Sequence, residues 1–133
     1  AMARETEDKS LDPAVLERGV RRALADPAKG RYLVAEQDGR AVGGLLLTLE
    51  WSDWRDGWFW WIQSVYVEPE ARGAGAYRAL HEHVLAEARR DPDVRGVRLY
   101  VEVENTRARA VYERLGMAEL AYRVYGLELA PRR

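Results

Sequence analysis

Residues 65–80 combine a strand pattern, a glycine-bearing turn and the start of a helix. The segment reads Val65-Tyr-Val-Glu-Pro-Glu-Ala-Arg-Gly-Ala-Gly-Ala-Tyr-Arg-Ala-Leu80. Glycines at positions 73 and 75 allow the backbone to approach a ligand closely. Unpaired N–H groups and the positive end of the helix dipole attract an anion at the start of the helix. Because Arg72 and Arg78 can add charge-assisted hydrogen bonds to phosphate, the turn is a candidate phosphate site.

Two common phosphate-binding motifs do not fit this turn. A P-loop requires Gly-Lys-Ser or Gly-Lys-Thr, and the sequence contains neither. The dinucleotide fingerprint requires a third glycine where Arg78 stands, and it requires an early βαβ unit where this chain has three predicted strands. The residues alone therefore leave two alternatives, a site for another phosphate ligand or a structural turn before a helix.

Composition excludes several classes of protein. The chain has 133 residues, of which 47% are hydrophobic and 32% charged, as in a globular domain. It has no cysteine, which excludes disulfides and thiolate catalysis, and the spacing of His81 and His83 does not favour a metal site. The net charge of −1 gives no basic field for nucleic acid, and no apolar run approaches the ~20 residues of a membrane span. We expect a cytoplasmic enzyme or binding protein.

Hydrophobic spacing and turn residues predict an α-βββ-α-β-α-β order. The predicted elements are a helix from Asp12-Pro13 to Asp26-Pro27, strands Tyr32–Glu36, Ala41–Glu50 and Trp58–Val67, a helix carrying Leu80, Val84, Leu85 and Ala88, a loop Asp91–Gly96, a strand Val97–Val103, a helix Asn105–Leu115 and a final strand within Met117–Leu129. This order predicts an α/β (α+β) fold in which an antiparallel meander leads into a β-α-β-α-β unit. Helices would cover both faces of the mixed sheet. We expect a polar segment at 1–10, with Ala1 as a cloning remnant, and a single domain at 11–133.

Two segments together resemble the GNAT acetyltransferase superfamily. The stretch SVYVEPEARGAGAYRAL resembles its cofactor motif, in which a strand ending V-x-P is followed by R-G-x-G and a helix. Downstream, Asn105-Thr-Arg-Ala-Arg-Ala-Val-Tyr112-Glu-Arg-Leu-Gly-Met117 resembles the family's pattern of N, then A, Y and L-G-F/M. The motifs occur in the family's order and separation and cover residues 60–117.

The resemblance implies acetyl-CoA as co-substrate and a role for each matched residue. The main chain of Val65, Tyr66 and Val67 would pair with the pantetheine arm, as an added strand would. The residues implied to hold the pyrophosphate are Arg72, Gly73, Ala74, Gly75, Ala76, Tyr77 and Arg78. Asn105 would contact the cofactor near its pantetheine, and Tyr112 would protonate the departing thiolate. Tyr112 also lies on the apolar stripe of its helix, so a core tyrosine is the alternative.

The chain departs from the family pattern in three places. Glu70 stands where the family often has glutamine or arginine, and Tyr77 stands where it often has a small residue. The family's first strand is missing, and residues 2–11 resemble the end of the first helix. We therefore expect either that the chain starts inside the family's fold or that it was trimmed.

The general base for an amine acceptor is left open by the sequence. Some family members use a glutamate on the central strand, but the matching region here holds Trp61 and Gln63. Glu102, on the predicted strand Val97–Val103, and Glu50 are the candidates, and catalysis by positioning and Tyr112 is the alternative. Aromatic residues at 51, 54 and 58–61 are concentrated in one hairpin. The alternatives for this cluster are a buried strand, an aromatic wall that binds the acceptor, and a dimer contact.

The function implied is transfer of an acetyl group from acetyl-CoA directly to an amine of a small-molecule or protein acceptor, without a metal. Nucleic-acid and membrane partners are not expected, and a homodimer is one option. The alternatives are a non-catalytic CoA-binding or protein-interaction module on the same fold and a nucleotide-binding regulator.

Overall fold

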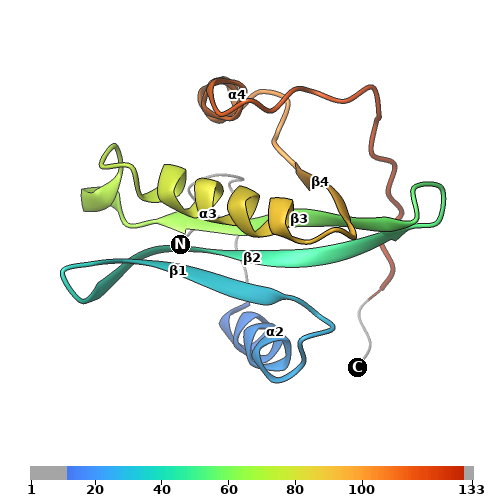
Figure 1. The fold of residues 1–133 in the computed structure, drawn as a ribbon. Coiled ribbons are helices and arrows are strands. Elements are labelled where there is room, and N and C mark those ends of the chain that lie inside the picture. Colours follow the sequence, from blue (N-terminus) through green and yellow to red (C-terminus); the bar gives the residue numbers. More distant parts are fainter. Residues whose placement is uncertain (1–11, 131–133) are drawn as a thin grey trace. The chain divides into compact units, whose positions relative to one another are not determined.

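The computed structural model describes residues 12–130, which fall into two compact units (Figure 1). The first unit runs through Glu102 and the second begins at Val103. The first contains α2 (Pro13–Ala25), β1 (Arg31–Gln37), β2 (Arg40–Ser52), β3 (Gly57–Val67), the 3₁₀ turn η1 (Pro69–Ala71), α3 (Ala76–Arg90) and β4 (Val94–Leu99). The second contains α4 (Thr106–Arg114). The predictions for residues 1–11, a polar segment and the end of a helix, lie outside the described residues.

The four strands of the first unit form one mixed sheet in the order β1-β2-β3-β4. β1 pairs with β2 and β2 with β3 in antiparallel fashion, whereas β4 runs parallel to β3 after the α3 crossover. Figure 1 shows α2 on one face of this sheet and α3 on the other. The predicted meander, the mixed sheet and helices on both faces are confirmed.

Local sequence explains where these elements begin and turn. The Asp12 side chain accepts the N–H of Ala14 at 2.9 Å, and Pro13 occupies the first helical turn, so the predicted start of α2 is confirmed. Asp38 (φ 55°) and Gly39 (φ 75°) both adopt left-handed backbone between β1 and β2. Two consecutive positive φ angles are typical of the type I′ hairpin that Asp-Gly favours.

The core of the first unit lies between α3 and the sheet. Its buried members are Leu45 and Leu47 of β2, Trp60 and Ile62 of β3, and Leu80, Val84 and Ala88 of α3. Val84 is fully buried and Leu45 is 1% exposed. Burial of each large apolar side chain contributes about 1.5–3 kcal/mol, and this packing holds α3 across β2 and β3.

The predicted boundaries of the fourth strand are wrong. β4 spans Val94–Leu99, so Asp91–Gly96 is not a loop throughout and the strand does not continue to Val103. Gly96 faces the Phe59 ring, and a Cβ there would lie 2.9 Å from a ring carbon. The glycine that indicated a loop therefore marks a close approach between two strands.

The predicted final strand is also absent. The structure assigns no helix or strand to residues 117–130. The alternating apolar side chains Leu120, Tyr122 and Val124 are all at least half exposed. A period of two shows that a segment can form a strand, but a strand also requires a neighbour to share its ladder of hydrogen bonds.

Candidate functional site

The turn between β3 and α3 has backbone geometry that glycine favours. Gly73 (φ 83°) and Gly75 (φ 87°) both adopt left-handed backbone, and Gly75 is the N-cap of α3. A Cβ built at either position would meet no atom within 4 Å, so the backbone angle and not crowding explains the glycines. The resulting turn is exposed and leads directly into the 15-residue helix α3.

Several amides of this exposed turn form no hydrogen bond to a backbone carbonyl within residues 12–130. The N–H groups of Ala71, Arg72 and Ala74 donate to carbonyls within the η1 turn at 2.9–3.3 Å. Across residues 12–130, the N–H groups at positions 73, 75, 76 and 78 donate to no backbone carbonyl, and the first bond into α3 is that of Ala79 to Gly75 at 2.9 Å. Unspent donors at the positive end of a helix attract an anion.

The two arginines of the turn have protein partners. The Arg72 Nε donates to the carbonyl of Val67 at 3.0 Å, and its guanidinium lies 5.8 Å from the Tyr66 ring centroid. These contacts tie the turn to the end of β3. The Arg78 Nε pairs with Glu82 at 2.9 Å on the exposed side of α3. Glu70, one departure from the family pattern, pairs with Arg40 at 2.8 Å.

β3 loses its parallel neighbour shortly before the turn. The pairs between β3 and β4 end at Ile62 and Leu99. Ser64 has a left-handed φ of 52°, and the register of β3 against β2 shifts at this point, which is the geometry of a β-bulge. After the bulge, Tyr66 and Val67 pair again with β2, and none of residues 65–67 pairs with β4. This open main-chain edge and the exposed amides of the turn follow one another at the same end of β3.

A polar and aromatic cluster, Glu50, Trp61, Arg98 and Tyr100, lies beside the last β3–β4 pair. The Trp61 indole N–H donates to Glu50 at 2.9 Å, and Arg98 approaches the same carboxylate oxygen at 3.6 Å. The Trp61 and Tyr100 rings stack with centroids 4.5 Å apart. Glu50 is thus engaged by two partners through one carboxylate oxygen. Sequence reasoning missed the cluster because strand register, and not local pattern, brings these residues together.

Glu102 lies beyond the end of β4 and is exposed. The expectation that it stands on a strand is wrong, because the ladder with β3 ends at Leu99. Its proposed role as a base remains a prediction.

The second motif forms α4 and both of its caps. The Asn105 side chain accepts the N–H of Ala108 at 3.1 Å as the N-cap. At the other end, Gly116 has a φ of 93°, and the N–H of Met117 donates to the Tyr112 carbonyl at 3.0 Å. With the bond from Gly116 to Glu113, this is a Schellman motif. Much of the motif therefore encodes the start and stop of a helix.

Tyr112 is half-buried within this second unit, and burial raises the pKa of its phenol. A raised pKa keeps the phenol protonated at neutral pH, so it can act as a proton donor.

A sequence profile described as the acetyltransferase (GNAT) family matches residues 2–117. The chain belongs to this family. The resemblance drawn from the two motifs is therefore confirmed.

Solved and curated relatives agree with the GNAT assignment. The structure of a possible acetyltransferase from Clostridium difficile 630 is 44% identical and has a TM-score of 0.91, covering 98% of this chain and 86% of that chain. A mycothiol acetyltransferase from Salinispora arenicola is 35% identical over 117 residues, covering 73% of this chain and 38% of that protein. Another, from Beutenbergia cavernae, is 40% identical over 85 residues, covering 63% and 28%. The chain spans less than two fifths of the length of these curated relatives.

The structure explains why this GNAT chain has Tyr77 where the family often has a small residue. The Tyr77 ring packs against the core cluster, and its hydroxyl lies 3.1 Å from His81 Nδ1. His81 is 1% exposed, and burial lowers its pKa. A large side chain at position 77 thus packs inward, while the Arg78 amide beside it remains at the exposed turn.

Proposed function

We propose that this GNAT chain transfers an acetyl group from acetyl-CoA to an amine. The observation that carries the proposal is the continuity between the open β3 edge at 65–67 and the exposed amides of the turn after it. A CoA thioester combines a diphosphate with an amide-bearing arm, so its two parts match these two features. Acetyl-CoA supplies an activated acetyl thioester.

Different residues of the chain bind the two parts of acetyl-CoA. The amides at 73, 75, 76 and 78 hold the diphosphate with the help of the α3 dipole. The main chain of residues 65–67 pairs with the amides of the arm and sets its direction along β3. Arg72 helps to position both the turn and the strand edge, because its hydrogen bond to the Val67 carbonyl joins the turn to β3.

The chemical step needs little beyond positioning and proton transfer. The neutral amine attacks the thioester carbonyl carbon, the new C–N bond forms and the C–S bond breaks. Tyr112 donates its phenolic proton to the departing sulfur, and the proton of the attacking nitrogen leaves through water or a carboxylate. Because the Glu50 carboxylate already contacts Arg98 and Trp61, we assign this last transfer to water or Glu102.

The curated relatives favour a small-molecule acceptor over a protein acceptor. Both are named mycothiol acetyltransferase. We include acetylation of a small-molecule amine in the proposal and leave the individual acceptor open.

A single charge at the start of α3 tests the cofactor site. In Ala76→Glu, the new carboxylate lies at the first position of the helix, where it favours the helix dipole but repels a diphosphate. We expect isothermal titration to show affinity for acetyl-CoA falling about tenfold or more. Ala76→Gln is the matched neutral control and should change the affinity less than about threefold, since it adds no charge.

The unfolding temperature distinguishes loss of the cofactor site from loss of the folded structure. The unfolding temperature of Ala76→Glu should equal or exceed that of Ala76→Gln. Equal acetyl-CoA affinity in the two variants contradicts the diphosphate assignment. If acetyl-CoA binds but no member of a broad amine panel is acetylated, the chain is a non-catalytic CoA-binding module instead.

A further inference from the structure

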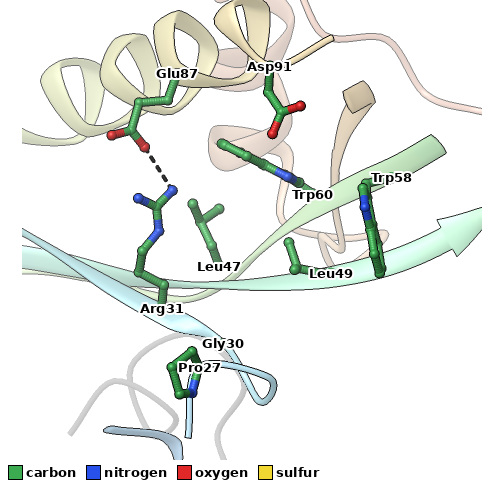
Figure 2. A pocket seen from close by; sticks show the side chains of 9 residues that line it. All are labelled: Pro27, Gly30, Arg31, Leu47, Leu49, Trp58, Trp60, Glu87 and Asp91. Atoms are coloured by element: carbon green, nitrogen blue, oxygen red, sulfur yellow. Dashed lines mark hydrogen bonds and ion pairs between the residues drawn. The ribbon is translucent and has the colours of Figure 1, made fainter. Parts of the chain in front are cut away.

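A cavity lies at the other end of β3 from the cofactor turn. It has a volume of about 450 Å³ and is lined by Pro27, Gly30, Arg31, Leu47, Leu49, Trp58, Trp60, Glu87 and Asp91 (Figure 2). Trp58 and Trp60 belong to the first residues of β3, whereas the open edge begins at Val65. Trp60 and Val65 are five positions apart along β3, at most about 16 Å for extended strand. The cavity shares no residue with the proposed acetyl-CoA site.

The floor of this cavity is apolar and aromatic. Leu47 and Leu49 of β2 lie beside Trp58 and Trp60 of β3, on the face that α3 covers. Because α3 ends at Arg90, it leaves Leu49 half exposed, at 49%. The volume of about 450 Å³ falls within the range of small-molecule sites.

Two carboxylates line the side of the cavity opposite this floor. Figure 2 shows Glu87 and Asp91 reaching from the end of α3 toward the sheet. Glu87 is already neutralised by Arg31 at 2.7 Å, and His83 lies 3.2 Å from its other oxygen. Asp91 accepts the N–H of Asp93 at 2.9 Å, and within residues 12–130 it forms no ion pair. Since the negative end of the helix dipole also lies here, the cavity favours an additional cation.

A contact within the cavity lining shows which kind of ligand group the cavity accommodates. The Arg31 guanidinium lies 5.5 Å from the Trp60 ring centroid while it pairs with Glu87. A cation held between an indole face and a carboxylate is thus accommodated on this floor. Trp58 and Asp91 also line this cavity, and they offer a ligand an indole ring and a carboxylate as well.

We propose that this cavity binds a small organic cation with an aromatic or aliphatic body, such as an arylalkylammonium ion. The ammonium group pairs with Asp91, and the apolar body lies against Leu49, Trp58 and Trp60. The distance from the open edge of β3 means that the bound cation is not the amine undergoing acetylation. The site is therefore additional to the proposed acetyltransferase centre.

Protonated 2-phenylethylamine is the probe that tests this site. Indole N–H signals, assigned with single Trp→Phe variants, report its binding by NMR. We expect saturable shifts of Trp58 and Trp60 at millimolar probe, with Trp54 unaffected because it lies 94% exposed at the hairpin tip. The neutral isostere 2-phenylethanol should bind about three- to tenfold more weakly, as the loss of one half-exposed ion pair predicts.

Two variants and one control variant show where the probe binds. Asp91→Asn retains an oxygen for the Asp93 N–H but removes the charge, so the affinity for the probe should fall by about three- to tenfold. Asp93→Asn is the matched control outside the cavity and should leave the affinity unchanged. Leu49→Lys places the chain's own ammonium in the cavity and should abolish the shifts while acetyl-CoA binding persists.

Several results overturn the proposal. These are equal affinity for the amine and the alcohol, an unchanged affinity in Asp91→Asn, and competition between the probe and saturating CoA. A change in sedimentation of Leu49→Lys would assign this face to contact between copies of the chain instead. The shifts are measured without CoA as well, so the outcome does not depend on the proposed acetyltransferase activity.

Discussion

Among the described residues, His81 is the one polar or charged side chain that is fully buried. Its Nδ1 meets the Tyr77 hydroxyl, whereas its Nε2 has no hydrogen-bond partner within residues 12–130. Burial lowers the pKa of His81 in the folded protein below its ordinary value of 6.5. The unfolded chain therefore binds a proton that the folded protein excludes, once the pH falls below that value.

The free energy of unfolding should consequently decrease as the pH falls below 6.5 and level off below the folded pKa. The contribution of His81 to this slope is at most about 1.4 kcal/mol per pH unit. Urea denaturation across this pH range should show a smaller slope in His81→Gln than in the wild type. The exposed His83→Gln is the control, and equal slopes for His81→Gln and the wild type would contradict the assignment.

Tyr112 carries the second prediction at the residue scale. Because burial raises its phenol pKa, it is a protonated donor at neutral pH. If it protonates the leaving thiolate, Tyr112→Phe should lower kcat about 100-fold, within the usual range for a lost general acid, and leave the Kd for acetyl-CoA within about twofold. Steady-state kinetics and titration calorimetry measure the two effects. Tyr125→Phe, 91% exposed, should have no effect, and wild-type kcat in Tyr112→Phe rules out the role.

At the scale of elements, strand pairing depends on one close approach. The Phe59 ring packs against two residues of β4, Gly96 and Arg98, and the Arg98 guanidinium lies 3.7 Å from the ring centroid. A Cβ at Gly96 would come within 2.9 Å of the same ring. The ring is buried and packed, so the absence of a side chain at position 96 allows this close approach of β4 to β3.

Gly96→Ala should therefore lower the free energy of unfolding by about 1–3 kcal/mol, the usual cost of overpacking. Gly19→Ala provides a control of opposite sign. Position 19 lies within α2, where a Cβ would meet no atom within 4 Å. There alanine should stabilise by about 0.5–1 kcal/mol. Urea denaturation measures both variants, and a neutral Gly96→Ala would show that the ring moves aside easily.

At the scale of the molecule, ordered strands and an irregular tail occur in one chain. Residues 58–62 have neighbours on both sides in the sheet, whereas residues 117–130 form no helix or strand. No described helix is long and apolar enough to cross a membrane. The division at Glu102 leaves the single domain at 11–133 as a prediction.

Hydrogen exchange should separate these two regions. Amides of residues 118–130 should exchange far faster than those of residues 58–62, because exchange protection follows stable hydrogen bonds in packed elements. Mass spectrometry of proteolytic fragments measures both regions in one experiment, and the strand serves as the internal control. Protection of the tail equal to that of β3 would restore the final strand expected from its alternating pattern.

The sequence alone determined the features that depend on neighbours along the chain. Asp12-Pro13, Asp38-Gly39 and the two glycines at 73 and 75 specify local backbone angles and caps, so α2, the hairpin and the turn before α3 were all predictable. The family followed for the same reason, since its two motifs consist largely of such turns and caps.

Tertiary structure decided the features that depend on strand register. The pairing of Gly96 with Phe59 set the position of β4 and removed Glu102 from it. The same register brought Glu50 to Trp61 and Arg98, and it assembled the cavity from four separate segments of the chain. A one-residue slip in register moves each side chain to the opposite face, and no local pattern reports which strand will be the neighbour.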